Sequence, residues 1–171
     1  NLYAGYILIG DEVLPDAKAA VSALRGQGVE HIAMLTGDNQ CAAEAVAGRL
    51  GLDACHWGLF PEDKVEMFET ISREKGQGQK TAFVGDGIND APVIARADVG
   101  IAMGAMGSAA AVETADVVLM TDSPMKVAEA VSIAKQTRRI VWQNIFLAFA
   151  VKGVFITFGA MGMASMWEAV F

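Results

Sequence analysis

The chain has little that would support a disulfide-rich fold or a nucleic-acid surface. Its two cysteines, Cys41 and Cys55, form neither a Cys-x-x-Cys pair nor a cluster with histidine. This excludes a disulfide framework and a cysteine zinc site, and it indicates reduced thiols in a cytosolic domain. The net charge of -7 argues against a nucleic-acid partner.

Charge is also scarce toward the C-terminus, because Lys152 and Glu168 are the only charged residues after Arg139. The whole chain is 53% hydrophobic and has a mean hydropathy of +0.36. These values are high for a soluble domain, and the excess lies in this last part. The preceding part has the composition of a soluble, acidic α/β domain.

An amphipathic helical pattern begins near Pro124 and becomes almost wholly apolar at Ile140. About 20 apolar residues cross the ~30 Å hydrocarbon core of a bilayer. Lys135, Arg138 and Arg139, just before the apolar run, place that end in the cytoplasm. The alternative is a buried core helix of a soluble domain. We expect a cytoplasmic domain over residues 1–137, a membrane-spanning helix with its lead-in over 138–165, and a second span beginning at 166–171. The protein would be an integral protein of a plasma or inner membrane, in contact with lipid.

Short apolar runs alternate with helical patterns from residue 5 to residue 120, and glycine or proline marks most boundaries. This alternation predicts an α/β fold with a doubly wound, mainly parallel sheet. The expected strands are 5–10, 32–35, 54–59, 81–84, 99–102 and 116–120, and the helices between them are near 15–25, 40–50, 61–75, 91–96 and 109–114. The absence of an initiator methionine leads us to expect a piece of a longer protein.

The most informative stretch follows the strand at 81–84. Asp86 lies between two glycines, and Asn89 and Asp90 come directly after them. Carboxylate and amide oxygens are hard ligands that suit Mg²⁺ beside a phosphate, and open α/β sheets bind ligands where their strands end. The alternative is an acidic loop that caps the next helix through Asp90.

Two further loops carry polar groups that suit a phosphate. Thr36, Gly37 and Asp38 follow a strand and precede a helix N-terminus, which favours anions; the same residues also make an ordinary N-cap turn. Lys64 lies in the first turn of a helix, where its charge opposes the helix dipole and needs a partner. A phosphoryl group would supply one, and the alternative is a solvated surface lysine. Phosphate donors, a cation and a Mg²⁺ site are the requirements of phosphoryl transfer.

These segments, in this order and followed by a membrane span, resemble the C-terminal half of the phosphorylation domain of a P-type ATPase. That domain has the haloacid dehalogenase-like fold. The resemblance implies that Thr36, Gly37 and Asp38 hold the transferred phosphoryl group, and that Lys64 neutralises its charge. It also implies that Asp86 and Asp90 bind Mg²⁺, with Asn89 completing the site.

The sequence also departs from the family pattern. The phosphorylated Asp-Lys-Thr-Gly is absent, as are the nucleotide-binding and actuator domains and the earlier membrane helices. Many relatives carry an arginine where this chain has Leu14. We therefore expect the parent protein to use ATP and Mg²⁺ through an aspartyl-phosphate, and the isolated piece to be inactive.

The apolar run narrows the class of pump. Asn144 and Lys152 are eight residues apart, on adjoining faces of a helix and at two depths. An ionisable residue inside a span indicates a function, although a lysine can also snorkel to an interface. The pair is similar to the pattern of Zn²⁺, Cd²⁺ and Pb²⁺ exporters, which implies that Lys152 is a built-in cation on the transport pathway. Copper exporters usually have a tyrosine-asparagine pair here, which Gln143-Asn144 does not match. A pump for another cation such as Cu⁺ is the alternative.

Two other interpretations stay open. A membrane-anchored haloacid dehalogenase-type phosphatase needs two aspartates at the end of its first strand, and the segment at 10–13 offers only Asp11. A non-catalytic, truncated module would fold and bind Mg²⁺ without turnover. Hydrolysis of a small phosphate ester by this chain would favour the phosphatase, whereas the module differs from a pump only in what the full gene encodes. Metal-stimulated ATPase activity of the parent separates the possible cargo metals.

Overall fold

The computed structural model describes residues 12–85, 88–104 and 109–162, so the strand expected at 5–10 lies outside the described residues. The chain divides into two compact units, residues 1–129 and 130–171. The boundary falls inside one long helix, and each unit is considered by itself. The functional boundary expected after residue 137 stays a prediction.

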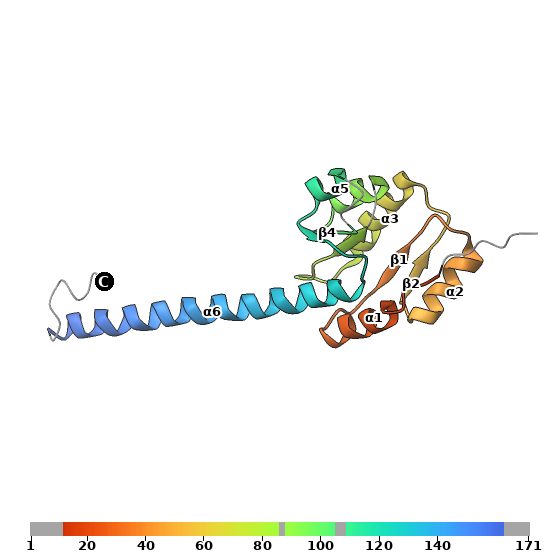
Figure 1. The fold of residues 1–171 in the computed structure, drawn as a ribbon. Helices are drawn as coiled ribbons and strands as arrows, with labels where there is room; N and C mark the ends of the chain where they lie inside the picture. The colour runs from red at the N-terminus through yellow and green to blue at the C-terminus, as the bar shows by residue number, and fades with distance from the viewer. Residues whose placement is uncertain (1–11, 86–87, 105–108, 163–171) are drawn as a thin grey trace, which may run out of the picture. The chain divides into compact units, whose positions relative to one another are not determined.

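All described strands of the first unit are parallel, as the alternation of elements predicts. β1 (Ala33–Leu35) pairs with β2 (Ala54–His56), and β3 (Ala82–Gly85), β4 (Val99–Met103) and β5 (Val117–Leu119) form a second sheet in that order (Figure 1). In the register of the second sheet, Val84 lies opposite Ile101 and Gly85 opposite Ala102. The strands thus form two separate sheets within the described part of the chain.

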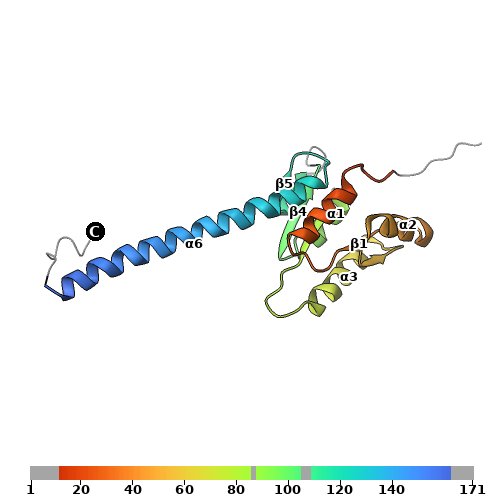
Figure 2. The same ribbon diagram turned by 90° about the horizontal axis from the view of Figure 1, so that it is seen from below.

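Helices follow the strands as expected. They are α1 (Ala17–Gly26), α2 (Gln40–Leu50), α3 (Pro61–Glu74), the 3-10 turn η1 (Ile88–Asp90), α4 (Ala91–Ile94) and α5 (Ala109–Thr114). α2 contacts α1 and β2, whereas α4 contacts β3 and β4. Figure 2 shows β4 and β5 adjacent in the second sheet. The order of elements therefore places a loop and a helix start after each strand.

The core of the second sheet is small and tightly packed. Ile94 and Ala102 are buried and contact Phe83, and Phe83 meets Phe68 edge-to-face with ring centroids 5.6 Å apart. Aromatic pairs in this geometry add about 0.5–1.5 kcal/mol beyond the area they bury. This contact ties α3 to β3, and these two elements carry two parts of the candidate site.

α6 (Met125–Ala160) is one continuous helix that contains the predicted apolar run. Among the described residues it is the helix that is long and apolar enough to cross a membrane. Its start is capped from α1, since the Asp16 carboxylate accepts hydrogen bonds from the Ser123 hydroxyl and the Met125 N–H. The Ser123 hydrogen bond is the main reason that the pKa of Asp16 is lowered.

Candidate active site

The loop after β1 folds into a compact turn. The Thr36 hydroxyl donates to the Asp38 carboxylate over 2.9 Å and accepts from the Asp38 N–H over 3.1 Å. Asn39 is the N-cap of α2, and its side-chain oxygen accepts from the N–H of Ala42. The turn therefore lies at the N-terminus of an 11-residue helix, where backbone N–H groups and the helix dipole favour an anion.

A second loop, which follows β2, fixes this turn in place. The N–H groups of Gly58 and Leu59 donate to the carbonyls of Asp38 and Thr36, over 2.9 and 3.1 Å. A Cβ at Gly37 would lie 3.3 Å from the carbonyl oxygen of Leu59, which is a tight approach to rigid backbone. A side chain at position 37 would therefore push the two loops apart.

The same second loop sets the direction of α3. The Asp63 carboxylate accepts from the Phe60 N–H over 3.0 Å, and Pro61 occupies the first helical turn. Both features stabilise a helix start, because the first N–H groups of a helix lack partners within it. Lys64 therefore projects from a well-defined first turn.

Lys64 meets the third loop directly. Its Nζ donates to Asp90 Oδ1 over 2.8 Å, and the two side chains are only 18% and 13% exposed. The lysine thus has the partner that its place in the helix demands, but this partner is a carboxylate predicted to bind Mg²⁺. The ion pair joins residues 26 positions apart, and no spacing in the sequence indicates it.

Gly85 allows this arrangement. Asp90 is buried in η1, and a Cβ on Gly85 would lie 2.7 Å from Asp90 Cβ and 3.1 Å from Asp90 Oδ2. Cβ atoms do not approach so closely, so the glycine is needed for Asp90 to lie against the end of β3. Asn89 is exposed on the same turn. Asp86 lies outside the described residues.

The donor set fits a magnesium ion in its chemistry. Asp90 keeps Oδ2 beside the Oδ1 that binds Lys64, and Asn89 adds an amide oxygen. Within residues 12–85, 88–104 and 109–162, no cluster of three His, Cys, Asp or Glu side chains is found. Asp86 would have to supply the further carboxylate, so its role as a ligand stays a prediction.

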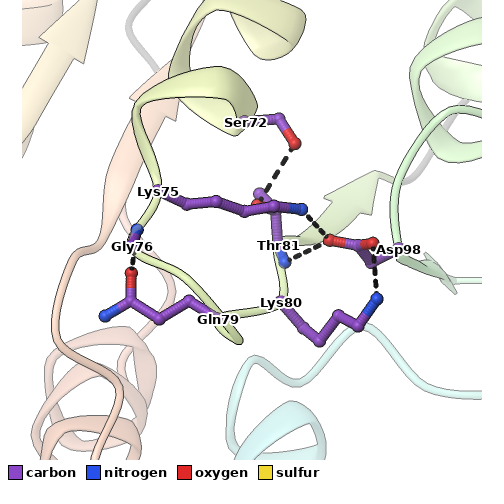
Figure 3. A network of polar contacts seen from close by, with 7 residues as sticks. All are labelled: Ser72, Lys75, Gly76, Gln79, Lys80, Thr81 and Asp98. Atoms are coloured by element: carbon purple, nitrogen blue, oxygen red, sulfur yellow. Dashed lines mark hydrogen bonds and ion pairs between the residues drawn. The ribbon is translucent and has the colours of Figure 1, made fainter.

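An acidic residue that sequence reasoning missed lies where β3 and β4 begin, at the other end of the strands from the site. Asp98 accepts hydrogen bonds from Lys75, from Lys80 over 3.1 Å and from the Thr81 N–H over 2.8 Å (Figure 3). The Lys75 ammonium, more than the other donors, holds the pKa of Asp98 far below its usual range. This network closes the loop between α3 and β3.

In the second unit, Asn144 and Lys152 lie on α6. They line one shallow hollow together with Leu147, Ala148 and Val151. These positions recur at helical spacing, so the hollow runs along one side of the helix. The two predicted pathway residues are thus close to the same side, and their role in transport stays a prediction.

Loops that follow parallel strands, together with the Lys64–Asp90 ion pair, form the candidate site of this α/β domain. A model of the haloacid dehalogenase-like hydrolases matches residues 2–98, and the chain belongs to this family. Its phosphatase members are typically Mg²⁺-dependent.

The sequence similarity to two metal-transporting ATPases also covers the long helix. The chain is 59% identical to a zinc-transporting ATPase of Synechocystis sp. and 55% identical to a cadmium, zinc and cobalt-transporting ATPase of Bacillus subtilis. Each match covers 99% of this chain, but only 23% and 24% of the relative. A crystal structure of a zinc-transporting PIB-type ATPase in its E2.Pi state matches 94% of the chain and 25% of that protein, at 41% identity and a TM-score of 0.83. The chain is therefore homologous to about a quarter of a heavy-metal P-type ATPase.

Proposed function

We propose that this chain is the phosphoryl- and magnesium-binding part, together with the membrane span that follows it, of an ATP-driven exporter of Zn²⁺, Cd²⁺ or Pb²⁺. The observation that carries the proposal is the Lys64–Asp90 pair, which joins a cation and a carboxylate at the ends of neighbouring loops. In a structural ion pair the two charges would simply neutralise each other. Here each has an obvious second partner, a phosphoryl oxygen for Lys64 and Mg²⁺ for Asp90.

The phosphoryl group would lie between the first loop and Lys64. The Thr36 hydroxyl now donates to Asp38, and a phosphoryl oxygen would be a stronger, charged acceptor for it. Lys64 would neutralise charge that develops on the transferred group, and Gly37 and Asp38 would shape the turn. Mg²⁺, held by Asp86 and Asp90 beside Asn89, supplies further charge neutralisation when it is bound.

The nucleophile would come from outside the described residues. Among these residues, β1 pairs with β2 along one edge, and β3 pairs with β4 along one edge. The other edge of each strand has no described partner, and Val84 of β3 is 38% exposed. An unpaired, apolar strand edge is a template for another strand. We infer that a strand from elsewhere in the longer protein pairs here and brings an aspartate to the loops that hold Lys64 and Asp90.

The reaction would then proceed in two steps. A carboxylate oxygen of that aspartate bonds to the γ-phosphorus of ATP as the bond to the bridging oxygen breaks and ADP leaves. Water later attacks the acyl phosphate, which releases inorganic phosphate and regenerates the carboxylate. Lys64 and Thr36 would stabilise the same phosphoryl oxygens in both steps.

The length of α6 supports a role for Lys152 inside the membrane. The run from Ile140 to Ala160 is about 30 Å long, which matches the hydrocarbon core. Asn144 then lies about 6 Å and Lys152 about 18 Å from its start, so Lys152 is close to the bilayer centre. The nearer end of the run is about 12 Å from Lys152, too far for its side chain to reach. A cation at this depth would repel a bound metal ion and favour its release.

Membrane placement follows from the same helix. The basic residues before the apolar run would keep the first unit in the cytoplasm of a cell whose plasma or inner membrane holds the pump. The actuator, the nucleotide-binding domain and the other membrane helices would be supplied by the rest of the longer protein.

The test is metal-stimulated ATP hydrolysis by the full-length parent protein, purified in lipid, across Zn²⁺, Cd²⁺, Pb²⁺, Co²⁺ and Cu⁺. We expect stimulation by Zn²⁺, Cd²⁺ and Pb²⁺, and its loss in Lys152→Ala but not in Lys18→Ala, which removes an exposed lysine of α1. Stimulation by Cu⁺ alone would contradict the assignment of cargo. Hydrolysis of a small phosphate ester in the presence of Mg²⁺, with no stimulation by any metal of this panel, would favour the membrane-anchored phosphatase.

A further inference from the structure

The lead-in to the apolar run carries a compact basic cluster, which we define as Lys135, Arg138 and Arg139. The whole chain has a net charge of -7, yet no acidic residue occurs between Glu129 and Glu168. The cluster is therefore a local concentration of positive charge in an acidic protein. Apart from orienting the membrane span, the cluster has no part in the proposed phosphoryl or transport chemistry.

The cluster occupies one side of α6. Its members and Trp142 are spaced by three, one and three residues, so they share a face of the helix, and all four side chains are exposed. Within the described part of the chain, Arg138 and Arg139 form no ion pair with an acidic side chain. Two guanidinium groups, each with several donors, are thus exposed on the same face as an indole.

The axial position of the cluster matches a lipid headgroup layer. If residues 140–160 fill the hydrocarbon core, the cluster covers about 6 Å of helix directly outside it. The headgroup region on each side of a bilayer is about 5–8 Å thick. Trp142 then lies about 3–5 Å inside the boundary, the depth at which indole rings are enriched.

We propose that Lys135, Arg138 and Arg139 form a binding site for the phosphate groups of anionic lipids in the cytoplasmic leaflet. The inference rests on the membrane-span part of the proposed function, but not on the metal that is carried. Basic side chains are suited to this partner because their positive charges attract the anionic phosphates at the membrane surface. The site would hold the helix at a fixed depth and so set the depth of Lys152.

The test uses the full-length parent in nanodiscs made of equal parts phosphatidylglycerol and phosphatidylcholine. After transfer to detergent, mass spectrometry measures the ratio of the two lipids that stay bound. The wild type is compared with Arg138→Gln/Arg139→Gln, with the charge-preserving Arg138→Lys/Arg139→Lys, and with Arg49→Gln/Arg73→Gln, which removes two exposed arginines from the first unit.

We expect the wild type, the lysine variant and the first-unit variant to keep phosphatidylglycerol. Each basic residue near an anionic surface contributes about 1 kcal/mol, or about five-fold in affinity. The glutamine variant should therefore lose about 30-fold in its preference for phosphatidylglycerol at this site. An unchanged ratio in the glutamine variant would overturn the proposal, as would an equal loss in the lysine variant.

Two measurements on the wild type keep the proposal testable if the glutamine variant does not fold. High salt should lower the preference for phosphatidylglycerol, because ions screen an electrostatic site at the membrane surface. A preference that does not change with salt would contradict the proposal. Displacement of the lipid by glycerol 3-phosphate would show that the site takes soluble phosphate instead. Neither measurement requires ATP turnover, so the lipid-binding proposal can fail while the pump assignment stands.

Discussion

Gly85→Ala is the substitution whose effect follows most directly from the structure. The new Cβ would lie 2.7 Å from Asp90 Cβ and 3.1 Å from both Asp90 Oδ2 and Phe83 Cε1. The nearest of these atoms is the first atom of a side chain, so it cannot move aside without moving the backbone of η1. Asp90 would shift, and the 2.8 Å contact between its Oδ1 and Lys64 Nζ would lengthen.

The expected change in the free energy of unfolding of Gly85→Ala combines two opposing effects. Overpacking of a tight site costs about 1–3 kcal/mol, whereas replacing glycine by alanine recovers about 0.4–1 kcal/mol by restricting the unfolded chain. The free energy of unfolding should therefore fall by about 1–2 kcal/mol. With a urea dependence of about 2 kcal/mol/M, the unfolding midpoint should fall by about 0.5–1 M.

The assay is urea unfolding of this chain in detergent micelles, followed by circular dichroism. Gly48→Ala in α2 is the matched control, because a Cβ there meets no atom within 4 Å and should stabilise the helix by about 0.5–1 kcal/mol. If Gly85→Ala raised the urea midpoint as Gly48→Ala is expected to do, the inference that Asp90 packs tightly against Gly85 would be wrong.

Three further predictions use the same assay or a related one. In a double-mutant cycle, Lys64→Met and Asp90→Asn should couple by about 1–2 kcal/mol, between the values for exposed and buried ion pairs; additive effects would contradict the contact. The pKa of Asp98 is lower in the folded than in the unfolded protein, so its stabilisation is present above about pH 4 and is lost as the pH falls through the folded value. The difference in stability between wild type and Asp98→Asn should therefore shrink on acidification below pH 4, and a constant difference would refute this. Asp16→Ala should speed amide exchange at Met125, which loses its acceptor; unchanged exchange there would contradict the cap.

Much of the fold could be predicted from local patterns. The strands at 32–35, 81–84 and 99–102 agree with β1, β3 and β4 to within one residue, because each is a short apolar run. The predicted strand 54–59 is too long, since β2 ends at His56 and the chain then turns through Gly58 at φ 67°. The predicted helix 91–96 is also too long, because α4 ends at Ile94.

The site was only partly predictable. Sequence patterns placed Thr36, Lys64 and Asp90 after strands or at helix starts, where the structure has them. They did not indicate that Lys64 and Asp90 form an ion pair, because long-range partners leave no trace in spacing. Sequence reasoning noted the glycines around Asp86 but not that Gly85 makes room for Asp90. Asp98 was missed, because its partners come from two lysines and a backbone N–H across a loop.

Formation of a phosphoenzyme by the full-length parent would show whether this chain is part of a P-type pump. The protein would be incubated with Zn²⁺, Mg²⁺ and ATP labelled on its γ-phosphate, quenched in acid, and examined for covalent label that hydroxylamine removes. We expect label in the wild type and in Lys18→Ala, and a strongly altered level of label in Lys64→Ala. Absence of acid-stable label from the wild type, or a level in Lys64→Ala equal to that of the wild type, would contradict it.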